Sequence, residues 1–271
     1  MAGINQKKSL FVGTLNFFEL IFHSVVRDVR MQSGNATFGV FKEVANMAMF
    51  IGMFYMIYSF MGRSIAIRGD FMMFLLTGVA LMVVHMKAIG SVRSASKATS
   101  AIMQHVPMTV ILSITSKAFA GLYLQCVAVM IIVIVLWIIG MDLTVHNPNG
   151  LVLPVFFAWA SGIAVGLVLM VIAPLAPAIM GTFTQLYMRA QMITSGKFIP
   201  AGYLPTSLVV YFDWNPLFHC IDQARLETFV NYNKEVSSMS YPIWFTAAFL
   251  VLGLMGEFWS RKNLSRSKHG N

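Results

Sequence analysis

The sequence predicts an all-α integral membrane protein with six transmembrane helices, and three observations support this. Hydrophobic residues make up 58% of the 271 residues, and only 11% are charged, whereas soluble domains have about 45–50% apolar and about 25% charged residues. The apolar residues also gather in runs of about 20, the length that a helix needs to cross a bilayer. Six such spans leave no room for a sizeable soluble domain, which excludes a self-contained ATPase.

The first expected element is an amphipathic helix over residues 15–30 that lies in the membrane interface. Its apolar residues at helical spacing are Phe18, Phe22, Val25 and Val29. Arg27 and Arg30 fall largely on other faces, as in helices that rest among lipid headgroups without crossing the bilayer. The alternative is a helix packed on another protein, and the two arrangements can coexist.

Six apolar segments follow this helix. The predicted spans are residues 44–61, 71–89, 118–140, 151–173, 175–194 and 243–259. Pro174 and Pro177 mark a very short turn between the fourth and fifth spans, because proline cannot continue the helical hydrogen-bond ladder, so these spans should form a hairpin. Gly162 and Gly166 in the fourth span permit close helix approach.

Basic residues near the span ends predict that both termini are cytoplasmic, because Lys and Arg favour that side. With the N-terminus inside, the inner pieces hold Lys7, Lys8, Arg27, Arg30, Arg93, Lys97, Arg261, Lys262, Arg266 and Lys268. The outer loops hold Arg63, Arg68, Lys197, Arg225 and Lys234. Lys42, Lys87 and Lys117 then lie near cytoplasmic ends, where their stems can reach the headgroups.

The connection between the second and third spans, residues 91–107, is rich in Ser, Ala, Lys and Arg. A short amphipathic helix there suits a protein that receives force from a separate cytoplasmic motor, and the alternative is an ordinary solvated loop. The residues expected to make this coupling contact are Arg93, Ser94, Lys97 and Pro107.

The connection before the last span, residues 195–241, is too long for a turn and too polar for a span. Its apolar side chains predict short broken helices that dip into the outer interface. Asn215 before Pro216 is a helix-start signal, since proline is preorganised for the first helical turn. The helix expected over 217–229 carries His219 and Asp222.

Several kinds of chemistry find no support in the sequence. The Gly196-Lys197 pair has Gln191 and Phe198 where a phosphate loop needs Gly and Ser or Thr. The histidines share no metal-ligand spacing, and the two cysteines give no disulfide framework. We therefore expect no cofactor in this chain. His219 and Asp222 are the pair that a membrane enzyme would require, although a structural hydrogen bond is the favoured interpretation.

Arg189 is a cation placed well inside the fifth predicted span. A charge at that depth normally faces a bundle interior or a wet cavity and marks a pathway. Gln185 and Gln191 could bind sugar hydroxyls along the same wall, so these three residues are the predicted translocation pathway. The alternative is an arginine that reaches the outer headgroups. An ion-driven carrier should have acidic residues inside its spans. The predicted spans have none in the middle, because Glu43 and Glu257 lie near span ends.

Two stretches of the sequence carry a family resemblance that covers nearly the whole chain. They are Arg27-Asp28-Val29-Arg30 followed by Gly34 and Gly39, and Trp214-Asn215-Pro216-Leu217-x-His219 followed by Arg225. With six spans in this layout, the chain resembles the permease subunit of bacterial ABC exporters for capsular polysaccharide, within the wider group that also exports O-antigen and teichoic acid. It departs from the family at the start of the first span, where Lys42 and Met47 replace an aromatic residue and a proline.

The resemblance implies a homodimer in the bacterial inner membrane that pairs with two copies of a separate ATPase, which binds ATP and Mg. The substrate would be a lipid-linked polysaccharide, with periplasmic and outer-membrane export components and membrane lipids as further partners and no nucleic acid. It also implies a coupling helix and short re-entrant helices before the last span. The alternatives are an unrelated secondary carrier or flippase and a membrane enzyme acting on glycolipids.

Overall fold

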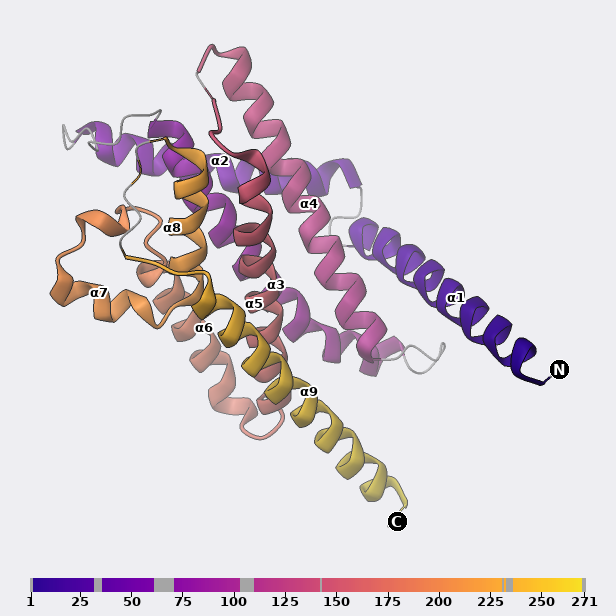
Figure 1. The fold of residues 1–271 in the computed structure, drawn as a ribbon. Helices are drawn as coiled ribbons and strands as arrows, with labels where there is room; N and C mark the ends of the chain where they lie inside the picture. The colour runs from indigo at the N-terminus through magenta and orange to yellow at the C-terminus, as the bar shows by residue number, and fades with distance from the viewer. Residues whose placement is uncertain are drawn as a thin grey trace.

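The structure is a computed structural model that describes residues 2–31, 36–60, 71–102, 110–141, 143–230, 232 and 236–269. Within these ranges the chain forms nine α-helices, two short 3-10 helices and no strand, which confirms the all-α class (Figure 1). The α-helices are α1 (Ala2–Met31), α2 (Ala36–Phe60), α3 (Phe71–Ile102), α4 (Val110–Ile138), α5 (Val152–Ile172), α6 (Pro177–Thr194), α7 (Thr206–Asp213), α8 (Pro216–Thr228) and α9 (Ser240–His269). The 3-10 helices are η1 (Pro148–Leu151) and η2 (Ala201–Tyr203).

Among the described residues, five helices are long and apolar enough to cross a membrane. These are α2, α3, α4, α5 with η1, and α9. They support the prediction of a multi-pass membrane protein. The predicted fifth span corresponds to α6, which has 18 residues and is not among the five. Its polar residues, Arg189 among them, lower its mean hydropathy.

Two helices begin before the predicted spans, and polar residues in these extensions have partners in the fold. Helix α2 includes Glu43, which forms an ion pair with Lys87 of α3. Helix α4 includes Ser116, which donates a hydrogen bond to Asp28 of α1 at 2.7 Å. The largest correction concerns residues 91–102, which continue α3 and form neither a loop nor a separate short helix.

Helices α3 and α5 pack closely at the centre of the molecule (Figure 1). Two glycines of α5 make this possible, as expected for small residues four apart. A Cβ atom at Gly162 would lie 2.6 Å from the carbonyl oxygen of His85, and one at Gly166 would lie 3.0 Å from that of Ile89. The packing function predicted for this glycine pair is therefore confirmed.

The N-terminal helix α1 is longer than predicted, and the bundle contacts described for it lie in its C-terminal part. Val29 is buried and Val25 partly buried against α4, whereas Phe18 and Phe22 are 67% and 64% exposed. The N-terminal half projects away from the bundle (Figure 1). Arg30 is exposed, while Arg27 is half-buried with Nη2 3.3 Å from Asp28 Oδ1.

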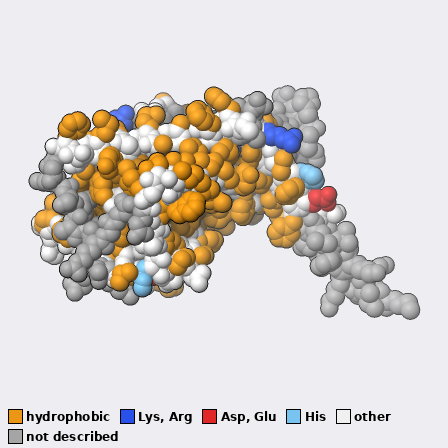
Figure 2. Space-filling model, turned by 90° about the horizontal axis from the view of Figure 1, so that it is seen from above, with side chains coloured by type: hydrophobic (Ala, Val, Ile, Leu, Met, Phe, Trp, Pro, Cys, Tyr) orange, Lys and Arg blue, Asp and Glu red, His pale blue; other side chains and the backbone are white. Residues whose placement is uncertain are grey.

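The outer faces of the apolar helices carry large hydrophobic side chains, and hydrophobic atoms cover much of the described surface in Figure 2. Trp244 and Trp259 are exposed toward the two ends of the apolar part of α9. Tryptophans favour the two membrane–water interfaces. This distribution suits a protein surrounded by lipid.

Candidate functional site

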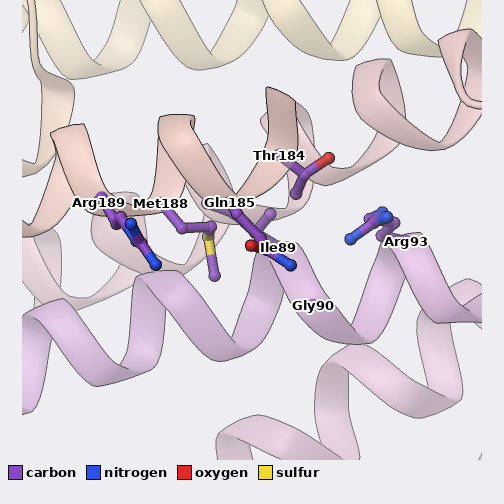
Figure 3. A pocket seen from close by; sticks show the side chains of 7 residues that line it. All are labelled: Ile89, Gly90, Arg93, Thr184, Gln185, Met188 and Arg189. Carbon is purple, nitrogen blue, oxygen red and sulfur yellow. The ribbon is translucent and has the colours of Figure 1, made fainter. Parts of the chain in front are cut away.

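A pocket of about 380 Å³ lies between α3 and α6. Its lining residues are Ile89, Gly90 and Arg93 from α3 and Thr184, Gln185, Met188 and Arg189 from α6 (Figure 3). On both helices successive lining residues are one or three positions apart, which places them on one helical face. The pocket is therefore formed by one face of α3 and one face of α6, and none of its lining residues belongs to a loop.

Two arginines give the pocket its charge. Arg93 is partly buried and Arg189 is exposed, and neither takes part in an ion pair within the described ranges. In Figure 3 they lie toward opposite ends of the row of labelled residues, with Met188 and Gln185 between them. Guanidinium groups bind phosphate and carboxylate in a bidentate manner, so an elongated anion with an apolar portion fits this lining.

Gly90 exposes the backbone of α3 to the pocket. It is exposed, whereas the preceding residue Ile89 is fully buried. A Cβ atom at Gly90 would meet no atom within 4 Å. The space beside Gly90 is therefore open, and a larger side chain there would enter the pocket.

The structure brings together some of the predicted site residues and separates others. Arg189 and Gln185 line the pocket, whereas Gln191 does not. Gln191 is fully buried, and its side-chain amide donates to the Tyr187 hydroxyl. Arg93, predicted to contact a motor, lines the same pocket as Arg189.

The other residues predicted for coupling occupy the end of α3 or lie beyond it. Ser94 is exposed, and its backbone carbonyl accepts a hydrogen bond of 3.1 Å from Lys117 Nζ. Lys97 belongs to α3. Pro107 lies outside the described residues. Sequence reasoning missed Arg93 as a pocket residue because it placed residue 93 in a loop.

Beyond the pocket, α6 is followed by a largely buried segment that we call the elbow, Ser195–Pro200. Arg225 of α8 is 1% exposed; it donates from Nη1 to the Gly196 carbonyl at 2.8 Å and from Nη2 to the Lys197 carbonyl. Its guanidinium carbon lies 3.7 Å from the centre of the Phe74 ring of α3. One side chain therefore joins α3, α8 and the elbow.

A second cation, Lys197, is also buried in the elbow. It is 1% exposed, and its Nζ donates to the Met192 carbonyl at 2.8 Å and lies 2.8 Å from Met82 Sδ. Cations at the end of α6 are favourable because its last carbonyls lack intrahelical partners and carry the negative end of the helix dipole.

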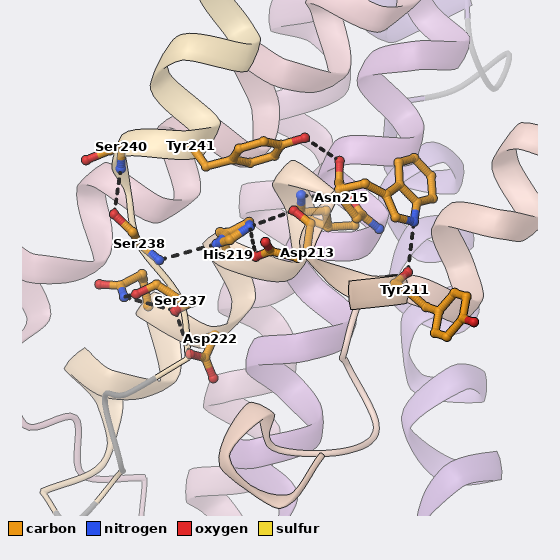
Figure 4. A network of polar contacts seen from close by, with 12 residues as sticks. Tyr211, Asp213, Asn215, His219, Asp222, Ser237, Ser238, Ser240 and Tyr241 are labelled. Atoms are coloured by element: carbon orange, nitrogen blue, oxygen red, sulfur yellow. Dashed lines mark hydrogen bonds and ion pairs between the residues drawn. The ribbon is translucent and has the colours of Figure 1, made fainter. Parts of the chain in front are cut away.

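The Trp214–His219 motif forms the start of α8 and its contacts (Figure 4). As predicted, Pro216 begins the helix and Asn215 caps it, with Oδ1 accepting from the Leu217 N–H at 2.9 Å. Asn215 Nδ2 also donates to Thr194 Oγ1 at 2.9 Å, which ties α8 to the end of α6. The motif is thus a structural joint between the two helices.

His219 and Asp222 lie on one face of α8 but bind different partners. Nε2 of His219 lies 2.9 Å from the Asp213 carbonyl oxygen, and its Nδ1 accepts from the Ser238 N–H. The Asp222 carboxylate instead accepts from the hydroxyls of Tyr232 and Ser237. Both residues thus have structural partners, but the predicted hydrogen bond between them is not found among the described contacts.

The ion pair of Glu43 and Lys87 corrects two expectations. Helix α2 begins before the predicted span, so Glu43 lies within the apolar segment Thr37–Phe60. It is 7% exposed. Lys87 therefore has a carboxylate partner in the fold and does not serve only to reach the headgroups. An acid inside a span is a feature of ion-driven carriers.

Comparisons with known proteins found no family model that matches the chain and no curated protein that matches its sequence. The site must therefore be interpreted from its own geometry. That geometry comprises an arginine-lined pocket between α3 and α6, and a buried joint that fixes the end of α6 to α3 and α8.

Proposed function

We propose that this chain is the permease subunit of an ABC exporter that moves a lipid-linked capsular polysaccharide across the bacterial inner membrane. The pocket with Arg93 and Arg189 carries the proposal. Capsular glycans and lipid phosphates are usually anionic, and two cations without an ion-pair partner among the described residues, in a partly apolar pocket, attract such a substrate. Gln185 adds a hydrogen-bonding group for sugar hydroxyls between them.

The position of the pocket along α3 is consistent with substrate loading from one membrane surface. Arg93 lies two residues before the end of the apolar segment Phe71–Ala95. The pocket therefore adjoins the rim of the apolar layer, where the phosphate of a lipid anchor would lie. Counting basic residues makes this the cytoplasmic side, and we propose that both termini lie there.

In this proposal the fifth crossing is composite. Helix α6 by itself is not apolar enough to count as a span, but the elbow continues from its end. We propose that α6 with the elbow completes this crossing, and that α7 and α8 form the re-entrant unit at the outer side before α9 returns. Buried polar contacts satisfy the backbone groups at the elbow, which irregular backbone at membrane depth requires.

The proposed exporter needs further components. The chain carries no phosphate loop, so ATP and Mg would be bound by two copies of a separate ATPase that contact the end of α3 in a homodimer of this chain. Periplasmic and outer-membrane components would receive the glycan. O-antigen and teichoic acid are the alternative glycans, and mass spectrometry of the glycolipid that co-purifies with the protein distinguishes them.

The test replaces Arg189 in cells whose own copy of the gene is deleted, with surface polysaccharide as the readout. We expect Arg189→Ala to lower export strongly, Arg189→Lys to retain part of it, and Arg189→Glu to be the most defective. Arg30→Ala is the matched control, because Arg30 is exposed on α1 and remote in sequence from the pocket. Equal export by Arg189→Ala and the unmodified protein, at matched protein levels, contradicts the proposal.

A second candidate, an ion-coupled carrier, is favoured by the buried Glu43–Lys87 pair. Such a carrier would work in proteoliposomes without any ATPase. Substrate movement driven by an ion gradient alone, and abolished in Glu43→Gln, would support this candidate. Movement that requires an added ATPase would support the exporter.

A further inference from the structure

We propose that the pocket between α3 and α6 binds one elongated ligand with two acidic groups, one at Arg93 and one at Arg189, and that Gly90 sets the width of the ligand that fits between them. This inference deepens the proposed function and rests on it for the source of the ligand. The binding itself is a property of the chain alone. Three features support it: the lack of acidic residues on the pocket helices, the order of the lining side chains and the open space at Gly90.

The helices that form the pocket provide no counter-ion for its two arginines. The sequence has no Asp or Glu from residue 71 to 141 or from 143 to 212. These ranges contain α3, α4, α5 and α6, with the chain that joins α3 to α4 and α5 to α6. Among the described residues, neither Arg93 nor Arg189 takes part in an ion pair. Because arginine stays protonated, both charges are available to the acidic groups of a ligand.

The two arginines lie toward opposite ends of a row that follows the helix axes. The pocket extends over residues 89–93 of α3 and 184–189 of α6, which is about 6–7.5 Å at about 1.5 Å per residue. In Figure 3 the side chains of Met188 and Gln185 lie between the two arginines. A ligand that fills this row therefore lies lengthwise along the helices, with one end at each guanidinium group.

A ligand with a single acidic group would leave one arginine without a counter-ion. Arg93 is partly buried, and an unpaired charge in partly apolar surroundings is costly. Arg189 is exposed on α6, which the proposed function places in the apolar layer, where a charge normally faces a partner or a wet cavity. A ligand with two acidic groups supplies both counter-ions. Its middle segment would contact Met188 and the Gln185 amide, which suits the apolar faces and hydroxyls of a sugar ring.

Gly90 lacks the constraints that explain other glycines of the two central helices. At Gly78 of α3, and at Gly162 and Gly166 of α5, an added Cβ atom would lie 2.6–2.9 Å from its nearest neighbour. At Gly90 it would meet no atom within 4 Å, and Gly90 is not among the residues with a positive φ. Neither packing nor backbone conformation therefore requires glycine here, although glycine disfavours a helix interior.

The position of Gly90 gives it a role in the pocket. It is exposed, whereas Ile89 before it is fully buried. It lies three residues before Arg93 on the same face of α3. A side chain at residue 90 would enter the space between the two arginines, so the size of this residue sets the width of the ligand.

The experiment measures the binding of linear α,ω-bisphosphonates to the full chain by isothermal titration calorimetry in nanodiscs of phosphatidylcholine, which has no net charge. Each bisphosphonate has one acidic group at either end of an alkyl linker, and the linker length is varied. Monophosphonates with the same number of carbon atoms are the matched ligands. We expect one bisphosphonate per chain and, at the best linker length, an affinity about tenfold or more above that of the monophosphonate, because the second group binds intramolecularly.

Substitutions then test whether one ligand contacts both arginines. Arg93→Gln and Arg189→Gln should each lower the affinity for the bisphosphonate to that for the monophosphonate. Arg30→Gln, on the exposed face of α1, should retain the difference. A bisphosphonate that binds no more tightly than the monophosphonate at any linker length, or that binds with two molecules per chain, overturns the proposal.

The role of Gly90 is tested by side-chain size. Gly90→Leu should abolish the preference for the bisphosphonate, and Gly90→Ala should retain part of it. Gly52→Leu is the matched control, because an added Cβ atom at Gly52 of α2 also meets no atom within 4 Å but Gly52 does not line the pocket. Melting temperatures verify that the variants fold, and unchanged binding in Gly90→Leu overturns the role of Gly90. The series on the unmodified chain tests two-point binding without any substitution.

Competition separates two sources of such a ligand. We expect tetragalacturonate, an acidic oligosaccharide, to displace the bisphosphonate, which assigns the site to an acidic glycan strand. Displacement by cardiolipin alone, a lipid with two phosphates, would assign it to a lipid headgroup and overturn the glycan. Two-point binding together with normal export by Arg189→Ala would contradict the exporter and keep the ligand class. Lost export without two-point binding would contradict this inference alone.

Discussion

Arg225 donates a hydrogen bond from Nη1 to the carbonyl oxygen of Gly196, 2.8 Å away, and so attaches the middle of α8 to the end of α6. Gly196 lies just beyond the last turn of α6, where the carbonyls have no intrahelical partner. The same guanidinium stacks on Phe74 of α3. The Arg225 side chain therefore connects α3, α8 and the end of α6.

Arg225→Met should destabilise the protein by several kcal/mol, because two buried carbonyls lose their donors at about 1–3 kcal/mol each. Arg225→Lys should recover only part of this loss, since an ammonium group lacks the planar fork of arginine. The melting temperature in detergent measures both variants. Arg30→Met is the exposed control and should melt like the parent; equal melting of Arg225→Met and the parent would exclude this role for Arg225.

The contact between α3 and α5 predicts opposite effects for two glycine substitutions. Gly162→Ala should destabilise the protein by about 1–3 kcal/mol, because the new Cβ would lie 2.6 Å from the His85 carbonyl oxygen. Gly52→Ala in α2 meets no atom within 4 Å and should stabilise the protein by roughly 0.5–1 kcal/mol through helix propensity. Thermal unfolding measures the sign of the stability change in each variant. If Gly162→Ala and Gly52→Ala destabilised the protein equally, the interhelical contact would be unimportant.

The sequence predicted the fold better than the site, for physical reasons. Apolar runs identify long helices directly, and Asn215-Pro216 predicted the start of α8 because capping is a local interaction. Hydropathy did not predict that α2 and α4 begin earlier, because these segments contain polar residues whose partners are distant in sequence. Glu43 pairs with Lys87, and Ser116 donates to Asp28. Such partners are not visible in local hydropathy.

The pocket illustrates the same limit. Gln185 and Arg189 were identified because a charge in an apolar run is conspicuous. Arg93 was not, because the lower hydropathy after residue 89 resembles a loop, whereas α3 continues to Ile102. If the predicted helix had been extended past residue 89, helical spacing would have placed Arg93 on the same face of α3 as Gly90.

The continuous end of α3 predicts how the proposed motor acts. Ser94→Pro should break the helix at the end of the pocket, because proline removes a backbone donor and clashes with the carbonyl of residue 90 in the preceding turn. We expect loss of glycan-stimulated ATP hydrolysis in the complex with unchanged membrane insertion. Ser94→Ala keeps the helix and the carbonyl that Lys117 binds, and it should retain hydrolysis. Unchanged stimulation in Ser94→Pro would separate this end of α3 from the motor.

The contact between α1 and α4 gives the last prediction. Asp28 is 7% exposed, and its Oδ2 accepts from Ser116 Oγ at 2.7 Å. Ser116→Ala would leave this buried carboxylate oxygen without its donor, and a hydrogen bond to a charged group contributes about 1.5–3 kcal/mol. Because α1 has few other buried side chains in its described part, the loss should detach the helix before the bundle unfolds.

We therefore expect Ser116→Ala to make α1 sensitive to protease at temperatures where α3 and α5 remain protected, and to lower the melting temperature only slightly. Glu19→Gln is the matched control: Glu19 lies 3.8 Å from His23 on the same helix, but both side chains are about 70% exposed, and such surface pairs contribute about 0–1 kcal/mol. Cleavage of α1 at the same rate in both variants would mean that the Asp28–Ser116 bond does not hold the helix. A double-mutant cycle with Asp28→Asn would then show whether Arg27, 3.3 Å from Oδ1, compensates for the loss.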